Sequence, residues 1–208
     1  MLSKNATKNT IVSLISLGIL SLLTFAMRTY IIKYLGVDIL GINETIVETV
    51  NLLSMSELGI QTSIAYKMYK PIIDNDLERQ RQLFNLYKIA YRIVGLIIIL
   101  LGLLIFPFIP KIVHTSISLR LVYAAYILQV GLMGLSYFYS YYKILFMTYQ
   151  RQYVYVRFEL LVKILGIISQ ITVIAMTNNY LLYLAINYIA LLFNSIFIIS
   201  KAKREYGI

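Results

Sequence analysis

Residues 164–200 read ILGIISQITVIAMTNNYLLYLAINYIALLFNSIFIIS and contain no charged side chain. A transmembrane helix crosses the roughly 30 Å hydrocarbon core in about 20 residues, so this run is too long for one crossing. Its one cluster of turn-forming residues is TNNY at 177–180, where asparagine favours a turn. The region therefore predicts two transmembrane helices, residues 155–177 and 180–200, joined by a tight turn.

Four more apolar stretches of similar length precede this hairpin. They cover residues 11–34, 39–68, 87–109 and 120–145. The chain of 208 residues is 60% hydrophobic and 13% charged, whereas soluble domains are about 25% charged. We therefore predict an all-α polytopic membrane protein, in which six transmembrane helices form a single lobe over residues 1–208.

The first stretch is predicted to be a permanent span. Lys4 and Lys8 precede it, as basic residues precede a signal peptide, but a cleavable signal ends a shorter apolar core at a small-residue site. Here the apolar run continues through Arg28 into TYIIKYLG. We therefore expect the segment to stay in the membrane.

The basic residues predict the orientation of the chain. The net charge is +10, and cytoplasmic loops of membrane proteins carry an excess of Lys and Arg. If the N-terminus is cytoplasmic, the outer side holds only Lys33, Lys111 and Arg120. The cytoplasmic side then holds Lys4, Lys8, Lys67, Lys70, Arg79, Arg81, Lys88, Arg92, Lys143, Arg151, Arg157, Lys201, Lys203 and Arg204. Both termini are therefore predicted to be cytoplasmic. Because these residues lie between apolar runs, we expect no nucleic-acid partner.

The largest loop follows the second predicted span. Pro71 is expected to end that helix, because proline is unfavourable in a helix interior. Asp76 is a candidate N-cap of the next helix, and Asp74 complements the helix dipole. The two carboxylates could instead hold a metal-bound nucleotide sugar, but no soluble catalytic fold accompanies them, so capping is the favoured interpretation.

Tyrosines are numerous near the predicted cytoplasmic ends of the fourth and fifth spans. Many of the 19 lie in SYFYSYY and TYQRQYVYV. Tyrosine is enriched where a membrane meets water, so these residues are predicted to form an interfacial aromatic belt. Stacking on sugars is the alternative.

Charged side chains inside the predicted spans are candidates for function. An ionisable group at the bilayer centre costs at least about 2.5–3.5 kcal/mol, so it usually faces a cavity or a partner. Arg28 could extend to the outer interface, or it could face a polar cavity, where its planar guanidinium suits phosphate oxygens. Lys163 lies four residues after Glu159, a spacing that allows pairing along one helix. We interpret that pair as mainly structural.

The second predicted span is polar on two faces. One face holds Glu44, Glu48, Asn51 and Met55, and the roughly opposite face holds Glu57 and Gln61. A helix that is polar on two sides cannot be wholly exposed to lipid. Glu57 is the deeper carboxylate, and it either bonds to a neighbouring helix or lines a cavity.

No catalytic constellation is recognisable in the sequence. The single histidine, His114, follows the third span and has no carboxylate at ligand spacing. Cysteine is absent, which excludes a thiolate metal site. We therefore expect no enzymatic activity, no cofactor and no metal site.

A series of motifs runs from the end of the first span into the fifth. It comprises Gly36 and Gly41 in LGVDILG, ELGI at 57–60, YKMYKP at 66–71, LYKIAYRIVG at 86–95 and SYFYSYYKILFMTYQRQYV at 136–154. In this order the motifs resemble the Wzx-type polysaccharide flippases of the multidrug/oligosaccharidyl-lipid/polysaccharide exporter superfamily, the MOP superfamily.

The resemblance implies a function in the bacterial cytoplasmic membrane. A flippase of this type moves an undecaprenyl-pyrophosphate-linked oligosaccharide to the outer leaflet for synthesis of a surface polysaccharide. The resemblance also implies a central cavity, for which the candidate residues are Arg28, Glu57, Gln61 and Lys163. Gly59 would let helices approach closely beside Glu57. The other structural candidates are Gly36, Gly41, Pro71 and Glu159.

Flippases of this type have two helical lobes, and this chain matches the N-terminal lobe alone, as would a truncated gene, a fragment or half of a split transporter. The resemblance therefore implies a partner, either a separate C-terminal lobe or a second copy of the chain. Three alternatives remain open: drug efflux by another branch of the same superfamily, a membrane remnant that transports nothing, and a membrane enzyme of polymer assembly.

Overall fold

The computed structural model describes residues 2–54, 59–113 and 117–207, and its elements are all helical, with no strand among the described residues. The α-helices are α1 (Leu2–Leu35), α2 (Val37–Ser54), α3 (Ile60–Ile73), α4 (Leu77–Ile105), α5 (Ile109–Ile112), α6 (Leu119–Ser140), α7 (Lys143–Thr148), α8 (Gln152–Thr177) and α9 (Tyr180–Tyr206). A short 3-10 helix, η2 (Phe106–Phe108), joins α4 to α5.

Within the described residues, five helical segments are long and apolar enough to cross a membrane. They are Asn5–Leu35, Leu77–Ile112, Leu119–Ser140, Gln152–Thr177 and Tyr180–Tyr206. They correspond to five of the six predicted spans, with ends that differ by up to ten residues or so at the start of α4. The prediction of an all-α, multi-pass membrane protein is confirmed at this level.

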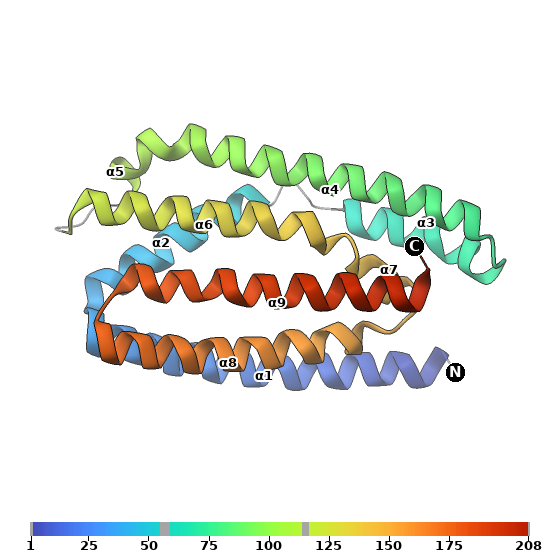
Figure 1. The fold of residues 1–208 in the computed structure, drawn as a ribbon, viewed down its shortest axis with the longest axis horizontal. Coiled ribbons are helices and arrows are strands. Elements are labelled where there is room, and N and C mark those ends of the chain that lie inside the picture. Colours follow the sequence, from blue (N-terminus) through green and yellow to red (C-terminus); the bar gives the residue numbers. More distant parts are fainter. Residues whose placement is uncertain (1, 55–58, 114–116, 208) are drawn as a thin grey trace.

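The remaining predicted span, residues 39–68, is not one helix. It is divided between α2 and α3, which end and begin near the middle of the length of the bundle (Figure 1). Gly59 caps the start of α3 with a φ of 91°, a left-handed conformation that glycine adopts without steric cost and that no continuous α-helix contains. The α3 helix also runs beyond Pro71 to Ile73, so the expectation that proline ends it is wrong.

Two predicted helix boundaries are confirmed by side-chain caps. Asp76 accepts a hydrogen bond from the backbone N–H of Arg79 at 2.9 Å, which caps the start of α4. In the α8–α9 turn, Asn178 adopts a φ of 49°. Asn179 then accepts hydrogen bonds from the first backbone N–H groups of α9.

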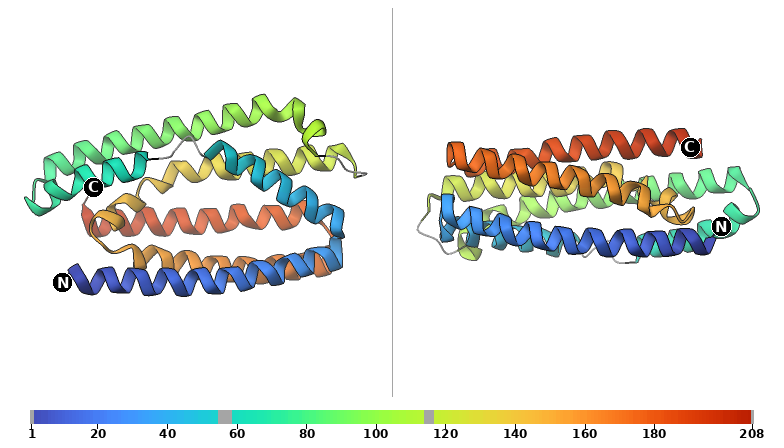
Figure 2. Two further views of the ribbon diagram at one scale, coloured as in Figure 1. Left: turned by 180° about the vertical axis from the view of Figure 1, so that it is seen from behind. Right: turned by 90° about the horizontal axis from the view of Figure 1, so that it is seen from below.

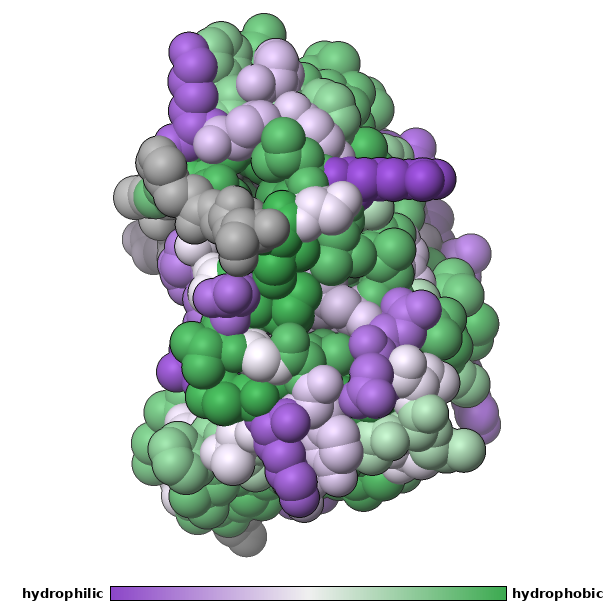
Figure 3. Space-filling view, turned by 90° about the vertical axis from the view of Figure 1, so that its left-hand side faces the viewer, coloured by the Kyte–Doolittle hydropathy of each residue, from purple (hydrophilic) through white to green (hydrophobic). Residues whose placement is uncertain are grey.

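The long helices run roughly parallel to the long axis of the molecule. In Figure 1, α8, α9, α6 and α4 lie side by side, with α1 packed against α8. From behind, α2 crosses from the end of α1 to α6, while α3 packs on the first half of α4 (Figure 2, left). Both chain termini lie at the same end of the bundle (Figure 1). At the other end, hydrophilic residues are scattered around a largely hydrophobic surface (Figure 3).

Helices α4 and α6 pack most closely at glycines. A Cβ atom on Gly102 would lie 2.4 Å from Cγ1 of Val130, and one on Gly134 would lie 2.3 Å from Cγ1 of Ile99. The Tyr126 hydroxyl donates a hydrogen bond to the Gly102 carbonyl at 2.9 Å. Small residues therefore set the spacing of this helix pair, as is usual in membrane bundles.

The tyrosines of SYFYSYY are not an interfacial belt. Tyr137, Tyr139, Tyr141 and Tyr142 are all buried in the hydrophobic core. Phe84 of α4 packs against two of these rings. The belt prediction is therefore wrong for this segment, because the rings fill the junction of α4, α6 and α7.

Candidate functional site

A polar cavity of about 420 Å³ lies between the apolar helices. Its walls come from α1, α2, α6, α8 and α9. Its charged and amide-bearing lining residues are Arg28, Asn43, Glu44, Glu48, Gln129, Lys163, Gln170 and Asn187. Polar groups are costly in hydrocarbon unless they have partners. A concentration of this size between membrane helices therefore marks a place for a polar ligand or water.

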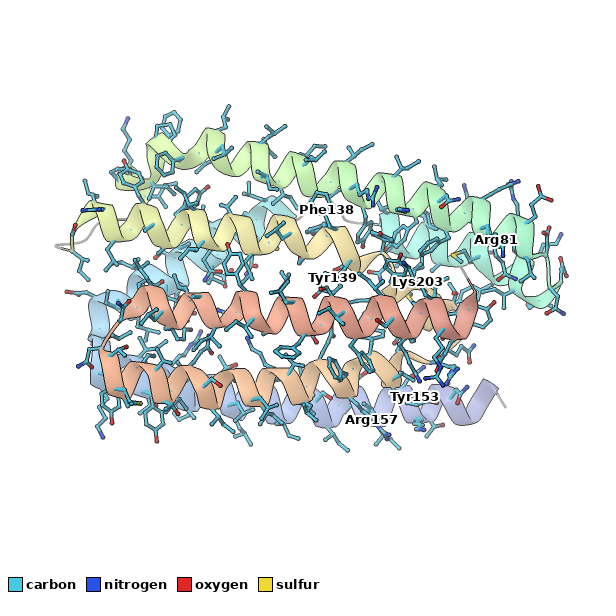
Figure 4. The ribbon with its side chains drawn as sticks, in the orientation of Figure 1. Arg81, Phe138, Tyr139, Tyr153, Arg157 and Lys203 are labelled. Carbon is cyan, nitrogen blue, oxygen red and sulfur yellow. The ribbon has the colours of Figure 1, made fainter. Side chains whose placement is uncertain are left out.

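Two smaller cavities adjoin the first one and share lining residues with it. One, of about 320 Å³, includes Asn51, Ser136 and Tyr139, and Figure 4 shows Tyr139 between α6 and α9. The other, of about 240 Å³, includes Ser16, Glu159 and Asn194. Lys163 lines all three cavities, so the polar interior extends along α8 on both sides of this lysine.

Lys163 is exposed to these cavities and forms no hydrogen bond or ion pair with any described residue. The predicted pairing with Glu159 is not seen. Glu159 instead pairs with Lys143 of α7, with 2.6 Å between Nζ and Oε1. The ion pair ties α7 to α8 and leaves the Lys163 ammonium free to bind an anion.

Arg28 forms an ion pair with Glu44 across the α1–α2 junction. The distance between Nη2 and Oε2 is 2.6 Å, and both side chains are partly exposed, at 51% and 37%. Arg28 therefore neither extends alone to the interface nor faces the cavity as a free cation. An anionic ligand would have to compete with Glu44 for its guanidinium.

The amides of the cavity provide hydrogen-bonding groups of both kinds. Gln170 donates from Nε2 to the Tyr183 carbonyl and to Asn187 Oδ1, each at 3.2 Å. At the far end of the polar interior, Asn194 Oδ1 and Ser16 Oγ are buried and make no hydrogen bond to any described residue. A side-chain amide both donates and accepts hydrogen bonds. Such a lining is therefore suited to binding hydroxyl groups, which also donate and accept.

Of the other two predicted cavity residues, only Gln61 can be placed. Glu57 lies outside the described residues. Gln61 belongs to α3, and its amide contacts the sulfur of Met147 in α7 at 3.5 Å. The structure therefore does not bring Gln61 together with Arg28 and Lys163, because α3 packs beside α4 and α7.

The predicted structural glycines have roles other than close packing. A Cβ atom on Gly59 would meet no atom within 4 Å, so the expected close helix approach is not seen and its backbone conformation explains the glycine. Gly36 has a φ of 92° and forms the turn between α1 and α2. Gly41 lies on an exposed face of α2. Pro71 is buried, and its carbonyl accepts a hydrogen bond from Gln80 at 3.0 Å.

The amide-bearing residues of the cavity are the part that sequence reasoning missed. Gln129, Gln170, Asn187 and Asn194 each stand alone in an apolar run. Asn187 and Asn194 are seven residues apart, a spacing that places both on one helix face and was the available signal. No protein-family model matches the chain, and neither a curated protein nor a solved structure is significantly similar to it.

Proposed function

We propose that the protein moves a lipid-linked oligosaccharide across the membrane and takes part in the synthesis of a surface polysaccharide. The observation that carries the proposal is the amide-lined cavity between apolar helices, which is also lined by Lys163, a lysine without an ion-pair partner among the described residues. The motif series that resembles the Wzx-type flippases supports the same substrate class.

The physical argument starts from the substrate. An oligosaccharide with a pyrophosphate cannot enter hydrocarbon, because each unsatisfied polar group there costs several kcal/mol. Gln129 and Asn187 offer hydrogen bonds to sugar hydroxyls. The Lys163 ammonium can pair with a phosphate oxygen, while the polyprenyl tail stays in the bilayer beside the helices.

Arg28 would bind the substrate only after it separates from Glu44. In the structure its charge is matched by Glu44. A pyrophosphate carries more negative charge than one lysine can neutralise, and the fork of a guanidinium binds two oxygens of such a group. We propose that the headgroup takes Arg28 from Glu44, which would loosen the α1–α2 junction when substrate arrives.

A second candidate function rests on Glu48. Its carboxylate lines the large cavity and forms no ion pair with a described residue. Such a carboxylate would attract a cationic drug, which would fit drug efflux of the kind carried out by another branch of the MOP superfamily. The two proposals differ in the residue on which binding depends, Lys163 or Glu48.

Binding to the purified full chain in detergent tests both proposals. The probe is an undecaprenyl-pyrophosphate oligosaccharide, and the reference is the same oligosaccharide on polyprenol without phosphate. Loss of a charge-assisted hydrogen bond corresponds to about 1.5–3 kcal/mol, so Lys163→Gln should weaken probe binding by about 10- to 150-fold. The matched control, Lys33→Gln, removes a lysine at the end of α1 that does not line the cavity.

The Arg28 variants and Glu48→Gln complete the experiment. Arg28→Ala should weaken binding of the probe, and Arg28→Lys should retain part of it, because lysine keeps the charge without the fork. If the wild-type chain bound both lipids equally, or if Lys163→Gln bound as wild type, the flippase proposal would be refuted. Tight binding of a lipophilic cation that Glu48→Gln abolishes would establish the efflux alternative.

A further inference from the structure

A second charged site lies outside the cavity, at the end of the bundle that carries the termini. Its centre is Tyr153, near the start of α8, which Figure 4 labels beside Arg157 of the same helix. The Lys8 ammonium of α1 lies 3.8 Å from the centre of the Tyr153 ring. The Arg157 guanidinium lies 5.7 Å from the same centre. Two cations from different helices therefore converge on one ring.

Asn9 fixes the two helices in this arrangement. Its Nδ2 donates a hydrogen bond to the Gln150 carbonyl at 3.1 Å, and its Oδ1 accepts one from the Tyr153 backbone N–H at 2.9 Å. Asn9, which follows Lys8, is thus bound both to Gln150 in the α7–α8 turn and to Tyr153 near the start of α8. The spacing between Lys8 and Arg157 is set before any ligand arrives, which lowers the cost of ordering the site on binding.

The positive charge of the site is not neutralised by the described part of the chain. Glu205 of α9 is the nearby carboxylate, and it is shared between Arg151 and Lys201, each at 2.9 Å. Lys8 and Arg157 form no ion pair with any described residue. The group defined by Lys8, Tyr153 and Arg157, which we term the Tyr153 site, therefore carries excess positive charge.

An exposed apolar surface continues from the Tyr153 site along the same two helices. On α1, Ile11 and Ile15 follow Lys8 at three and seven residues, and on α8, Leu161 and Leu165 follow Arg157 at four and eight. All four side chains are more than half exposed, and these spacings place them on the helix faces that carry the two cations. Both helices are membrane-crossing segments that begin within a few residues of this site.

We propose that the Tyr153 site binds the headgroup of an acidic phospholipid of the phosphatidylglycerol class. The phosphate would lie between Lys8 and Arg157, and the acyl chains would follow the apolar faces of α1 and α8. Basic pockets between membrane helices on the cytoplasmic side recognise anionic lipids in this way. This proposal is independent of the function assigned to the cavity.

Native mass spectrometry of the full chain in detergent, titrated with lipid, tests the proposal. The probes are dioleoylphosphatidylglycerol and, as the neutral reference, dioleoylphosphatidylcholine. Each basic residue near a membrane surface contributes about 1 kcal/mol to anionic lipid binding. Lys8→Gln combined with Arg157→Gln should therefore weaken phosphatidylglycerol binding about 30-fold, whereas Lys8→Arg combined with Arg157→Lys should retain it.

The charge-matched control is Lys67→Gln combined with Lys70→Gln. These two lysines are exposed on α3, near the same end of the bundle and far from α1. The control should bind phosphatidylglycerol as the wild type does. An equal loss in the control would show a general effect of net charge and overturn the proposal.

Two further measurements on the wild-type chain test the proposal without the glutamine substitutions. The wild-type chain should bind phosphatidylglycerol at least tenfold more tightly than phosphatidylcholine, a difference of about 1.4 kcal/mol, and equal affinities would refute the site. Inorganic phosphate at the concentration of the lipid should not displace phosphatidylglycerol, because it lacks the acyl chains. Displacement by phosphate would identify a free-phosphate site instead and overturn the assignment to lipid.

Discussion

The contact between α4 and α6 allows a stability prediction from one added methyl group. Replacing Gly102 by alanine would place a Cβ atom 2.4 Å and 2.9 Å from the two γ-carbons of Val130, whereas carbon atoms in contact are normally about 3.5–4.0 Å apart. Val130 is 4% exposed and is stiff at χ1, so its methyl groups cannot turn away from the new atom. The helices must separate instead.

The magnitude follows from two opposing effects. Overpacking a close contact typically costs about 1–3 kcal/mol, while alanine is about 0.8–1.0 kcal/mol better than glycine inside a helix. Gly166 of α8 isolates the second effect, because a Cβ atom there would meet nothing within 4 Å. We therefore expect Gly102→Ala to be less stable than Gly166→Ala by about 1–3 kcal/mol.

Equilibrium unfolding in mixed micelles, followed by far-ultraviolet circular dichroism, measures this difference. A double variant provides the internal check: Val130→Ala should cost less stability in the Gly102→Ala background than alone, because it removes the methyl groups that clash. A favourable coupling of at least about 1 kcal/mol is expected. Equal stabilities of Gly102→Ala and Gly166→Ala, or the absence of coupling, would refute the close α4–α6 packing.

Two other properties can be measured directly. Single cysteines can be introduced at Asn75, in the α3–α4 turn, and at Ser118, just before α6, in a chain that has no cysteine of its own. The α3–α4 turn and the start of α6 lie at opposite ends of the bundle (Figure 1). In intact cells an impermeant thiol reagent should label only the second, and the reverse pattern would invert the orientation predicted from the basic residues. Tyr149 donates a hydrogen bond to Gln80 at 2.8 Å, and burial raises the pKa of its hydroxyl above 10.0. Folding therefore favours the neutral hydroxyl. The free energy of unfolding of the wild type should exceed that of Tyr149→Phe by a constant amount below pH 10.0, and this difference should vanish as the pH rises through the raised pKa. A difference that grew with alkaline pH would contradict the buried hydrogen bond.

Sequence reasoning succeeded for the long helices because membrane crossing depends on length and hydropathy alone. The turn at 177–180 was identifiable because it interrupts a charge-free run that is too long for one helix. The division of residues 39–68 was not identifiable, since it depends on the backbone conformation of Gly59, and glycine is equally compatible with a continuous helix or a left-handed turn.

Only the charged residues of the candidate site were predicted from the sequence. Arg28 and Lys163 were recognised because ionisable groups are costly in a membrane. Their pairing could not be predicted, since it depends on which helices pack together. Glu44 pairs with Arg28, and Lys143 pairs with Glu159 in place of Lys163. The amides were missed because a lone Gln or Asn in a span often serves only to bond a neighbouring helix.

The interruption between α2 and α3 has a consequence for hydration. Each helix end leaves up to four backbone groups without a helical partner. In a bilayer, such groups are stable only where protein covers them or where they line an aqueous space. Asn51, one turn before the end of α2, faces the cavity that Lys163 also lines. Water in this cavity, close to the end of α2, would raise the local dielectric constant around the ammonium group. The broken helix would thereby lower the cost of keeping a charged lysine deep between apolar helices.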